Sequence, residues 1–310
     1  MSQPLPPVTI LLCTANGARF LPAQLASLLE QSHADWSLWI SDDGSTDGSR
    51  AIAEAFRDTH ATTRDIRLID GPRQGAAANF MSLLCHPDLP GGLVALCDQD
   101  DVWHPDKLER AARRLAAAPR ERPALYGAQS VHVDEALRPI GASRPPRRAP
   151  RFANALTQNI VSGHSAAMNG AALSLVRAAG PPAGIAYHDW WLYQLISGAG
   201  GAVLIDEARV LLYRQHAVNV LGAHRGARTR LRRLAMVFGG EYGRWIDAQS
   251  AALGQAGALL TAENRAILAS LRAGLGRGPL GLPHLMRAGV HRQSRAGTAL
   301  FYLAATLGRI

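Results

Sequence analysis

Blocks of apolar and polar residues along the first third of the chain predict strands that alternate with helices. Apolar runs typical of buried strands occur at residues 8–13, 37–41, 66–69 and 93–97. Apolar residues at helical spacing follow each run, at residues 19–31, 51–56, 80–84 and 105–115. This alternation predicts an α/β fold of Rossmann-like type, in which helices cover both faces of a mostly parallel sheet.

The alternation weakens after residue 124. Residues 138–151 are rich in Pro and Arg, and polar and small residues continue to residue 169. A helix at about 189–197 and a strand at 202–205 follow, and the pattern from residue 222 onward predicts helices. We therefore expect three segments, which are a nucleotide-binding half at 1–115, a second half at 116–222 and a helical C-terminal region at 223–310.

The composition is that of an ordinary globular protein and argues against several other classes. The 310 residues are 47% hydrophobic and 18% charged, which is unlike a disordered chain. The three cysteines have apolar neighbours and no paired spacing, which predicts reduced thiols in the cytoplasm and no zinc site. Residues 1–7 do not resemble a signal peptide, and no apolar run reaches the ~18 residues of a spanning helix.

The net charge of +9 is concentrated in the last third of the chain. Residues 221–310 contain 13 Arg, no Lys and three acidic residues, which gives +10, whereas residues 1–220 carry −1. Several of these arginines are interleaved with Leu, Val and Phe, a pattern that favours an anionic membrane surface. The plainer alternative is a solvated helix bundle. Nucleic acid is disfavoured as a partner because no known nucleic-acid motif accompanies the arginines.

Three carboxylates, Asp98, Asp100 and Asp101, directly follow the apolar run at 93–97. Ligands bind α/β sheets at the carboxyl ends of parallel strands, and carboxylate oxygens suit hard cations such as Mg²⁺ or Mn²⁺. Asp98 and Asp100 point to opposite sides of an extended strand, so the chain has to turn there if both are to reach one cation. The alternative is a solvated strand end whose Asp101 or His104 caps the next helix.

Asp42 and Asp43 end the strand at 37–41 beside a turn rich in Gly and Ser. A carboxylate at this place can accept a hydrogen bond from a pyrimidine N–H or a ribose hydroxyl. The structural alternative is a helix cap, a role that we expect for Asp47.

Candidates for the second half lie in two later segments. Asp189 opens a predicted helix, whose dipole favours a negative charge. Trp190 and Trp191 are adjacent on that helix, so we expect one of them to leave the core and form an apolar platform. Arg214 can bind a diphosphate through its guanidinium, and His216 can bind a metal ion or a phosphate.

Four segments together resemble the inverting GT-A glycosyltransferases of family 2. They are residues 8–17, Ile-Ser-Asp-Asp-Gly-Ser-Thr-Asp-Gly-Ser at 40–49, Asp-Gln-Asp-Asp-Val-Trp at 98–103 and His-Asp-Trp-Trp at 188–191. The segment Tyr-Arg-Gln-His-Ala-Val-Asn-Val-Leu-Gly at 213–222 is most similar to the rhamnosyltransferase-type branch. The resemblance covers about residues 8–222. It implies a GT-A fold in which residues 1–115 bind a nucleotide-sugar and residues 116–222 bind the acceptor and supply the catalytic base.

The resemblance also implies roles for individual residues. Asp189 is the expected general base, and Asp98 and Asp100 are the expected ligands of Mg²⁺ or Mn²⁺, with His216 as a further ligand. Gly163 with His164 is a weaker candidate for the donor pocket. The expected acceptor residues are Trp103, Trp190 and Trp191. The expected donor-binding residues are Cys13, Thr14, Asn16, Asp42, Asp43, Asn79, Asp98, Gln99 and Arg214.

The implied function is inverting, metal-dependent transfer of a sugar to a glycan or lipid-linked acceptor in bacterial surface polysaccharide synthesis. The expected donor is dTDP-L-rhamnose, and the alternative donor is a UDP-hexose or UDP-N-acetylhexosamine. The expected location is the cytoplasm, at the inner face of the cytoplasmic membrane.

Two other classes stay open. Asp-x-Asp-x-Val also fits a haloacid dehalogenase-type phosphatase, although that fold places the motif near the N-terminus and needs a later Lys, and no Lys follows Lys107. A non-catalytic nucleotide-sugar-binding protein is the second alternative, and the presence of the metal-binding acids and Asp189 argues against it.

Overall fold

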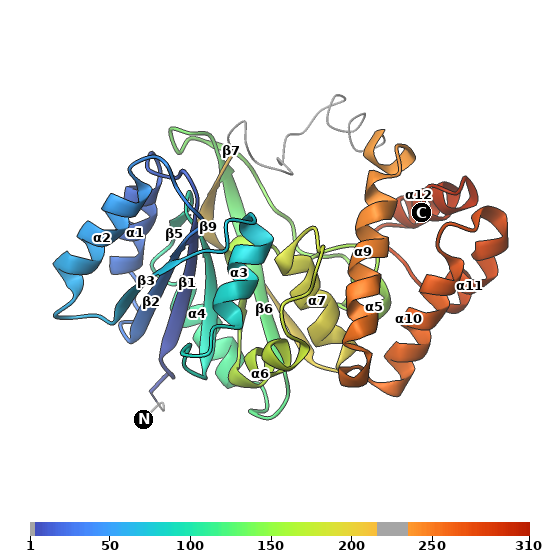
Figure 1. Cartoon of the computed structure of the whole chain (residues 1–310), viewed down its shortest axis with the longest axis horizontal. Helices are drawn as coiled ribbons and strands as arrows, with labels where there is room; N and C mark the ends of the chain where they lie inside the picture. The colour runs from blue at the N-terminus through green and yellow to red at the C-terminus, as the bar shows by residue number, and fades with distance from the viewer. Residues whose placement is uncertain (1–3, 216–234) are drawn as a thin grey trace. The chain divides into compact units, whose positions relative to one another are not determined.

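The computed structural model describes residues 4–215 and 235–310, which form two compact units (Figure 1). The first unit contains residues 4–145, 161–181 and 201–215, and the second contains residues 146–160, 182–200 and 235–310. Each unit is therefore assembled from segments that are far apart in the sequence. The functional halves expected at 1–115 and 116–222 remain predictions.

Within the described residues, nine strands form a single mixed sheet in the first unit. The strands are β1 (Val8–Thr14), β2 (Trp36–Asp42), β3 (Ile66–Asp70), β4 (Leu93–Asp98), β5 (Val102–Trp103), β6 (Ala124–Val133), β7 (Pro139–Ala142), β8 (Ala167–Met168) and β9 (Ala202–Arg214). Their order is β3-β2-β1-β4-β8-β6-β9-β5, with β7 paired to β6. The first four strands in this order pair in parallel, as do β6 and β9, whereas β5, β7 and β8 pair antiparallel.

Helices cover both faces of this sheet, as the alternation of strands and helices predicts. Helices α1 (Leu21–Leu29), α2 (Ser49–His60) and α4 (Lys107–Ala116) share one core cluster with Ile10 and Leu12 of β1. Leu11 is equally buried but lies outside that cluster, because successive side chains of a strand point to opposite faces. The opposite face is covered by α3 (Ala76–Leu84) and α6 (Gly170–Ala179), which contact each other (Figure 1).

The strand β6 lies inside the sheet, although the sequence pattern loosens after residue 124 and predicts no strand at Ala124–Val133. Its pattern is obscured by buried polar residues. Gln129 and Ser130 are both buried, and their partners come from other segments. Ser143 Oγ donates to Gln129 Oε1 at 2.8 Å and accepts from the Ser130 amide at 2.8 Å. A hydrophobicity pattern misses a strand whose polar groups are satisfied by such distant contacts.

The second unit is helical, as predicted for the C-terminal region. It contains α5 (Phe152–Ala155), α7 (His188–Gly198), α9 (Glu241–Gln255), α10 (Ala262–Gly274), α11 (Leu282–Arg287) and α12 (Arg295–Thr306), with 3₁₀ turns η2 (Gly257–Leu259) and η3 (Gly278–Gly281). Thr261 and Ser294 cap α10 and α12 through side-chain hydrogen bonds. Among the described residues, no helix combines the length and apolarity needed to cross a bilayer.

A buried carboxylate joins α4 to the sheet of the first unit. Asp206 on β9 is 6% exposed and accepts two hydrogen bonds from the Arg110 guanidinium, at 2.9 and 3.0 Å. Tyr126 Oη and the Ala208 amide each donate a further bond at 3.0 Å. Burial alone would raise the pKa of Asp206, but the bonds from Arg110, Ala208 and Tyr126 outweigh it and hold the pKa below its usual value.

We expect Asp206→Asn to lower the free energy of unfolding at pH 7 by about 2 kcal/mol, because it breaks a mostly buried ion pair. The folded-state pKa lies below the unfolded value of about 3.9, so this stabilisation is present above that pH and is lost as pH falls through the folded pKa. Urea denaturation from pH 7 to pH 3 should therefore show the two proteins converging in acid. Asp58→Asn, at the exposed ion pair with Arg57, is the control and should change stability by less than about 1 kcal/mol. A constant gap between wild type and Asp206→Asn at all pH values would contradict the assignment.

Candidate active site

The carboxyl ends of β1, β2 and β4 bring most of the expected donor-binding residues of the first unit to one edge of the sheet. Thr14 pairs in register with Asp42, and Cys13 pairs with Asp98. This edge is where α/β sheets bind ligands. The side chain of Cys13 is buried, and burial, followed by the nearby Asp98, raises the pKa of its thiol well above the usual value. Cys13 therefore remains a neutral thiol.

The side chain of Gln99 joins the loop after β4 to the loop after β1. Its Oε1 accepts hydrogen bonds from Thr14 Oγ1 at 2.6 Å and from the Ala15 amide at 2.9 Å. Its Nε2 donates to the Ala15 carbonyl at 3.2 Å. A Cβ atom on Gly17 would lie 2.1 Å from Gln99 Oε1. The absence of a side chain at residue 17 therefore makes room for this clamp.

Asp42 and Asp43 fix two further loops at the same edge. Asp42 Oδ1 accepts from the amide and the hydroxyl of Ser45, at 3.0 and 2.5 Å. Asp43 accepts the amide of Arg73 on Oδ1 at 2.6 Å and the amide of Gly75 on Oδ2 at 2.7 Å. Each carboxylate oxygen of Asp43 has accepted one amide hydrogen and retains acceptor capacity.

Two other expected donor residues hold the same loops. Asn16 Oδ1 accepts from the amide and the hydroxyl of Thr46, at 2.9 and 3.2 Å. Asn79 is 1% exposed, and its amide nitrogen donates to the Ser41 carbonyl at 3.2 Å. Asp47 accepts the Ser49 amide at 2.9 Å, but the N-cap of α2 is Gly48, so Asp47 binds this first-turn amide from one residue before the cap position expected for it.

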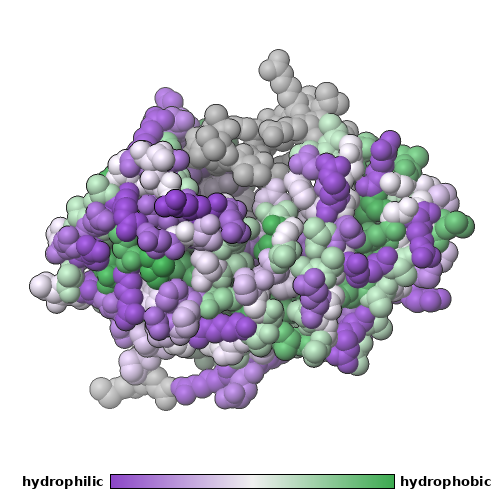
Figure 2. Space-filling model, in the orientation of Figure 1, coloured by the Kyte–Doolittle hydropathy of each residue, from purple (hydrophilic) through white to green (hydrophobic). Residues whose placement is uncertain are grey.

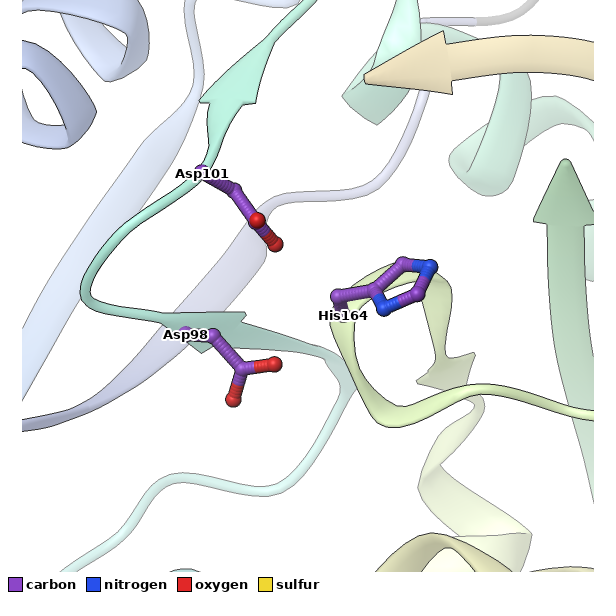
Figure 3. Close-up of side chains that lie close together, drawn as sticks. All are labelled: Asp98, Asp101 and His164. Atoms are coloured by element: carbon purple, nitrogen blue, oxygen red, sulfur yellow. The ribbon is translucent and has the colours of Figure 1, made fainter. Parts of the chain in front are cut away.

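The carboxylates after β4 form a cluster with a histidine. Ligand atoms of Asp98, Asp101 and His164 all lie within 4.8 Å of one another, and Figure 3 shows both carboxylates directed toward the side on which His164 lies. Asp100, the expected second metal ligand, is not part of this trio. Gln99 and Asp100 form the turn between β4 and β5, and a turn brings its first and fourth residues together. The sequence predicts that the chain has to turn here if two of the carboxylates are to reach one cation. That turn brings Asp98 close to Asp101.

The burial of this cluster makes it suitable for a cation. Asp101 is fully buried, and its Oδ1 accepts the Arg214 amide at 3.2 Å, whereas Oδ2 has no hydrogen-bond partner. Burial, followed by Asp100 and Asp98, raises the pKa of Asp101 well above its usual value. Burial, followed by Lys107, lowers the pKa of His164 to about 3. His164 is therefore neutral, which is the form that binds metals.

Lys107 and Trp103 form the buried floor beside this cluster. Lys107 Nζ donates to the His164 carbonyl at 2.9 Å and lies 3.1 Å from the centre of the Trp103 ring. Burial lowers the pKa of Lys107 to about 7, against the opposing effect of Cys97 and the carboxylates. Trp103 is 1% exposed, so its ring offers almost no surface to an acceptor, in contrast to the role expected for it.

Arg214 ends β9 and is 3% exposed. Its Nε donates to the Asp100 carbonyl at 2.9 Å and its Nη1 to the Glu135 carbonyl at 2.5 Å. The neighbouring Tyr213 stacks on the His164 ring with 4.3 Å between centroids. Arg214 thus supports the turn that carries the carboxylates. The expected metal ligand His216 lies outside the described residues.

Asp189 lies in the first turn of α7, in the second unit, where its Oδ1 accepts the Trp190 amide at 2.7 Å. Trp190 and Trp191 are 4% and 1% exposed. The expectation that one of these rings forms an exposed platform is wrong, because α7 is buried on nearly all sides. Trp190 donates from Nε1 to the Ala155 carbonyl at 2.6 Å and stacks on Tyr242.

Sequence reasoning missed the partnership of Asp101, His164 and Lys107. The three-residue spacing from Asp98 to Asp101 was a usable signal, because a turn aligns such positions. No signal connected His164 to them, since it joins the cluster from a segment more than 60 residues later.

The fold and this acidic edge are those of a nucleotide-sugar-dependent glycosyltransferase of the GT-A type. The family model of glycosyl transferase family 2 matches residues 9–173, and the chain belongs to that family. It is 28% identical over 242 residues to the dTDP-rhamnosyl transferase RfbG of Shigella flexneri, covering 73% of this chain and 78% of that protein. It is 31% identical over 103 residues to the UDP-Glc:alpha-D-GlcNAc-diphosphoundecaprenol beta-1,3-glucosyltransferase WfgD of Escherichia coli, covering 33% and 38%.

Solved structures agree on the fold. The mannosyltransferase PcManGT from Pyrobaculum calidifontis, in complex with GDP-Man and Mn²⁺, has a TM-score of 0.54 and 18% identity and covers 98% of this chain and 86% of that chain. TarS 1–349 of S. aureus, in complex with UDP-GlcNAc, has a TM-score of 0.57 and 14% identity, with coverage of 92% and 93%. These findings confirm the predicted glycosyltransferase and exclude the phosphatase.

We expect the Gln99 side chain, held by its hydrogen bonds to Thr14 and Ala15, to leave no room for a side chain at residue 17. Gly17→Ala should lower the free energy of unfolding by about 1 to 2 kcal/mol, because the new Cβ displaces the Gln99 side chain. In a Gln99→Ala background the same substitution should cost on the order of 1 kcal/mol less. Urea denaturation of the four proteins measures this coupling.

Gly91→Ala is the matched control, because a Cβ at residue 91 meets no atom within 4 Å, and it should be nearly neutral. Strictly additive effects of Gly17→Ala and Gln99→Ala would show that the clamp does not restrict residue 17.

Proposed function

We propose that this glycosyltransferase moves L-rhamnose from dTDP-rhamnose, with inversion, to a glycan or lipid-linked acceptor in bacterial surface polysaccharide synthesis. The observation that carries the proposal is the similarity to a dTDP-rhamnosyl transferase across 73% of the chain. A UDP-hexose or UDP-N-acetylhexosamine donor is the second candidate. It is favoured by the similarity to a UDP-Glc-dependent enzyme, which extends over 33% of the chain.

The proposed donor site is the edge formed by the ends of β1, β2 and β4. In this proposal Asp43 accepts a hydrogen bond from the base or ribose, which is supported by the acceptor capacity that its two oxygens keep after binding the Arg73 and Gly75 amides. Thr14 and Gln99 lie on the loops that would border the nucleotide. The hydrogen bonds of Gln99 and Asp43 already fix these loops. Donor binding therefore costs little further conformational entropy of the loops.

The residues proposed to hold Mg²⁺ or Mn²⁺ are Asp98, Asp101 and His164. The carboxylate oxygens suit a hard cation, and a buried, unpartnered Asp101 Oδ2 is the kind of atom that a cation would satisfy. A bound cation would neutralise charge that develops on the leaving diphosphate. Lys107 and Arg214 support this cluster through the His164 and Asp100 carbonyls, and the wider expectation of Asp100 and His216 as ligands stays a prediction.

Asp189 is the proposed general base that takes the proton of the acceptor hydroxyl. It lies in the first turn of α7, and the bond from the Trp190 amide fixes its orientation. A positioned base of this kind contributes about 10²- to 10⁴-fold to the rate. A single displacement at the anomeric carbon then inverts the configuration.

The proposed location is the inner face of the cytoplasmic membrane. The +10 charge of residues 221–310 supports this proposal, because it favours an anionic surface. Arg228, Arg230, Arg232 and Arg233 lie outside the described residues.

We expect dTDP-rhamnose to stabilise the enzyme against heat more than UDP-glucose or UDP-N-acetylglucosamine does at equal concentration with Mn²⁺. A ligand at about 100 times its Kd adds about 2.7 kcal/mol of stability, which a thermal-shift screen resolves. Transfer from the preferred donor to a lipid-linked acceptor would complete the test. A larger thermal shift with UDP-glucose or UDP-N-acetylglucosamine would instead assign a UDP-hexose or UDP-N-acetylhexosamine as the donor.

The cation site has its own prediction, with a readout that does not depend on activity. Asp101→Asn and His164→Gln should each weaken Mn²⁺ binding at least ~10-fold, measured by the electron paramagnetic resonance of free Mn²⁺ without donor. Asp106→Asn, at an exposed acid in the same region, is the control. If Mn²⁺ binding were unchanged in both variants but lost in Asp100→Asn, the cation site would be assigned to Asp100 instead.

We expect Asp189→Asn to retain the thermal shift by the donor and to lose transfer by at least ~10²-fold, because the amide cannot accept the hydroxyl proton. Glu241→Gln, which changes the first-turn acid of α9, should retain both. Wild-type transfer rates in Asp189→Asn would remove Asp189 from the role of base.

A further inference from the structure

An apolar surface is exposed in the C-terminal part of the second unit. Of the six large apolar side chains that are exposed among the described residues, four lie from η3 to Leu307, the residue directly after α12. They are Leu280 at 81%, Met286 at 69%, Leu303 at 52% and Leu307 at 56% exposure. Single exposed apolar residues are ordinary, but a concentration of four within 28 residues of sequence indicates an interaction surface.

Packing within the unit places these side chains on neighbouring elements. Met286 and Leu303 line one hollow of about 420 Å³, together with Leu282, Tyr302 and Thr306. Tyr302 Oη donates to the carbonyls of Leu285 and Val290, at 3.2 and 3.1 Å, and so holds α12 against α11.

The other two apolar side chains continue this surface. Leu307 follows Leu303 by four residues, so both lie on the same side of α12. A Cβ on Gly278 would lie 3.3 Å from the Thr306 carbonyl, so η3, which carries Leu280, packs on the last turn of α12. We call Leu280, Met286, Leu303 and Leu307 the apolar patch. Figure 2 shows hydrophobic residues among hydrophilic ones on the surface of the C-terminal helices.

The charge around the apolar patch is of one sign. Residues 264–310 contain seven Arg, no Lys and no acidic side chain. Arg277, Arg287, Arg295 and Arg309 are exposed, and among the described residues none of them forms an ion pair. A purely hydrophobic self-association face would not need this excess of positive charge, and the excess opposes the approach of a second identical surface.

We infer that the apolar patch and its arginines dock the enzyme on an anionic lipid bilayer. Exposed Leu and Met side chains enter the boundary between headgroups and acyl chains, while arginines pair with lipid phosphates at the same depth. The inference deepens the proposed membrane location and rests on the proposed function for its purpose, which is access to a lipid-linked acceptor. It assigns the contact to residues of η3, α11 and α12, separate from the arginines at 228–233.

Flotation of the full-length enzyme with vesicles tests this inference. Wild type should float with vesicles of phosphatidylcholine mixed with phosphatidylglycerol, and much less with phosphatidylcholine alone. Leu303→Gln combined with Met286→Gln should lower the partition coefficient on the order of tenfold, because two apolar side chains are lost from the acyl boundary. Arg287→Gln combined with Arg295→Gln should lower binding to the anionic vesicles by about tenfold or more and weaken its salt dependence.

Matched controls come from the first unit. Ile140→Gln removes an apolar side chain that is 52% exposed on β7, and Arg120→Gln combined with Arg144→Gln removes two exposed arginines. These variants should float like wild type. Equal flotation of wild type and the Leu303/Met286 variant, with both proteins folded by circular dichroism, would overturn the inference. Loss of a dimer in sedimentation velocity without a change in flotation would assign the patch to self-association instead.

The same variants separate this inference from the proposed function. The thermal shift produced by the nucleotide-sugar should be unchanged in the Leu303/Met286 variant, because the donor site lies in the first unit. Failure of vesicle binding with a normal donor shift would overturn the docking surface alone. A normal flotation with no response to any nucleotide-sugar would instead remove the proposed donor.

Discussion

The burial of carboxylates at the carboxyl end of β4 is the constraint on which the rest of the site depends. Asp101 is fully inside the protein, and Asp98 is close to it, so the fold has to offset the cost of two like charges in a poorly solvated place. The Lys107 amine, whose pKa burial lowers to about 7, offsets part of this cost, and the Arg214 amide supplies a hydrogen bond. One oxygen of Asp101 is left without a partner, and that residual cost is what a divalent cation would remove.

The loops around this constraint are fixed by side chains. Gln99 binds the loop after β1, and Asp43 binds the loop after β3 through two backbone amides. Such bonds satisfy backbone groups that irregular segments leave without partners. They also order the edge before any donor arrives. Several residues that the sequence nominates as ligand contacts therefore have a structural task as well, and the two tasks are compatible because carboxylate and carboxamide oxygens accept more than one hydrogen bond.

The two units show how far residue patterns reach. The strands β1, β2 and β4 were predictable, because each buries a nearly continuous run of residues. The strand β6 was not, because Gln129 and Ser130 are buried and their partner is Ser143, which directly follows β7. The full burial of both Trp190 and Trp191 was equally unpredictable, since spacing within α7 says nothing of the segments that surround it on several sides.

The sequence by itself determined the family, the positions of the first four strands along the chain and the identity of the acidic motif, because these depend on local patterns and fixed spacings. Tertiary structure decided which of those acids meet. The turn at Gln99 and Asp100 joins Asp98 to Asp101, and the chain returns much later to add His164 and, through Arg214, a support for the turn. Distances between residues far apart in sequence are set by the packing of whole elements, so no spacing along the chain encodes them.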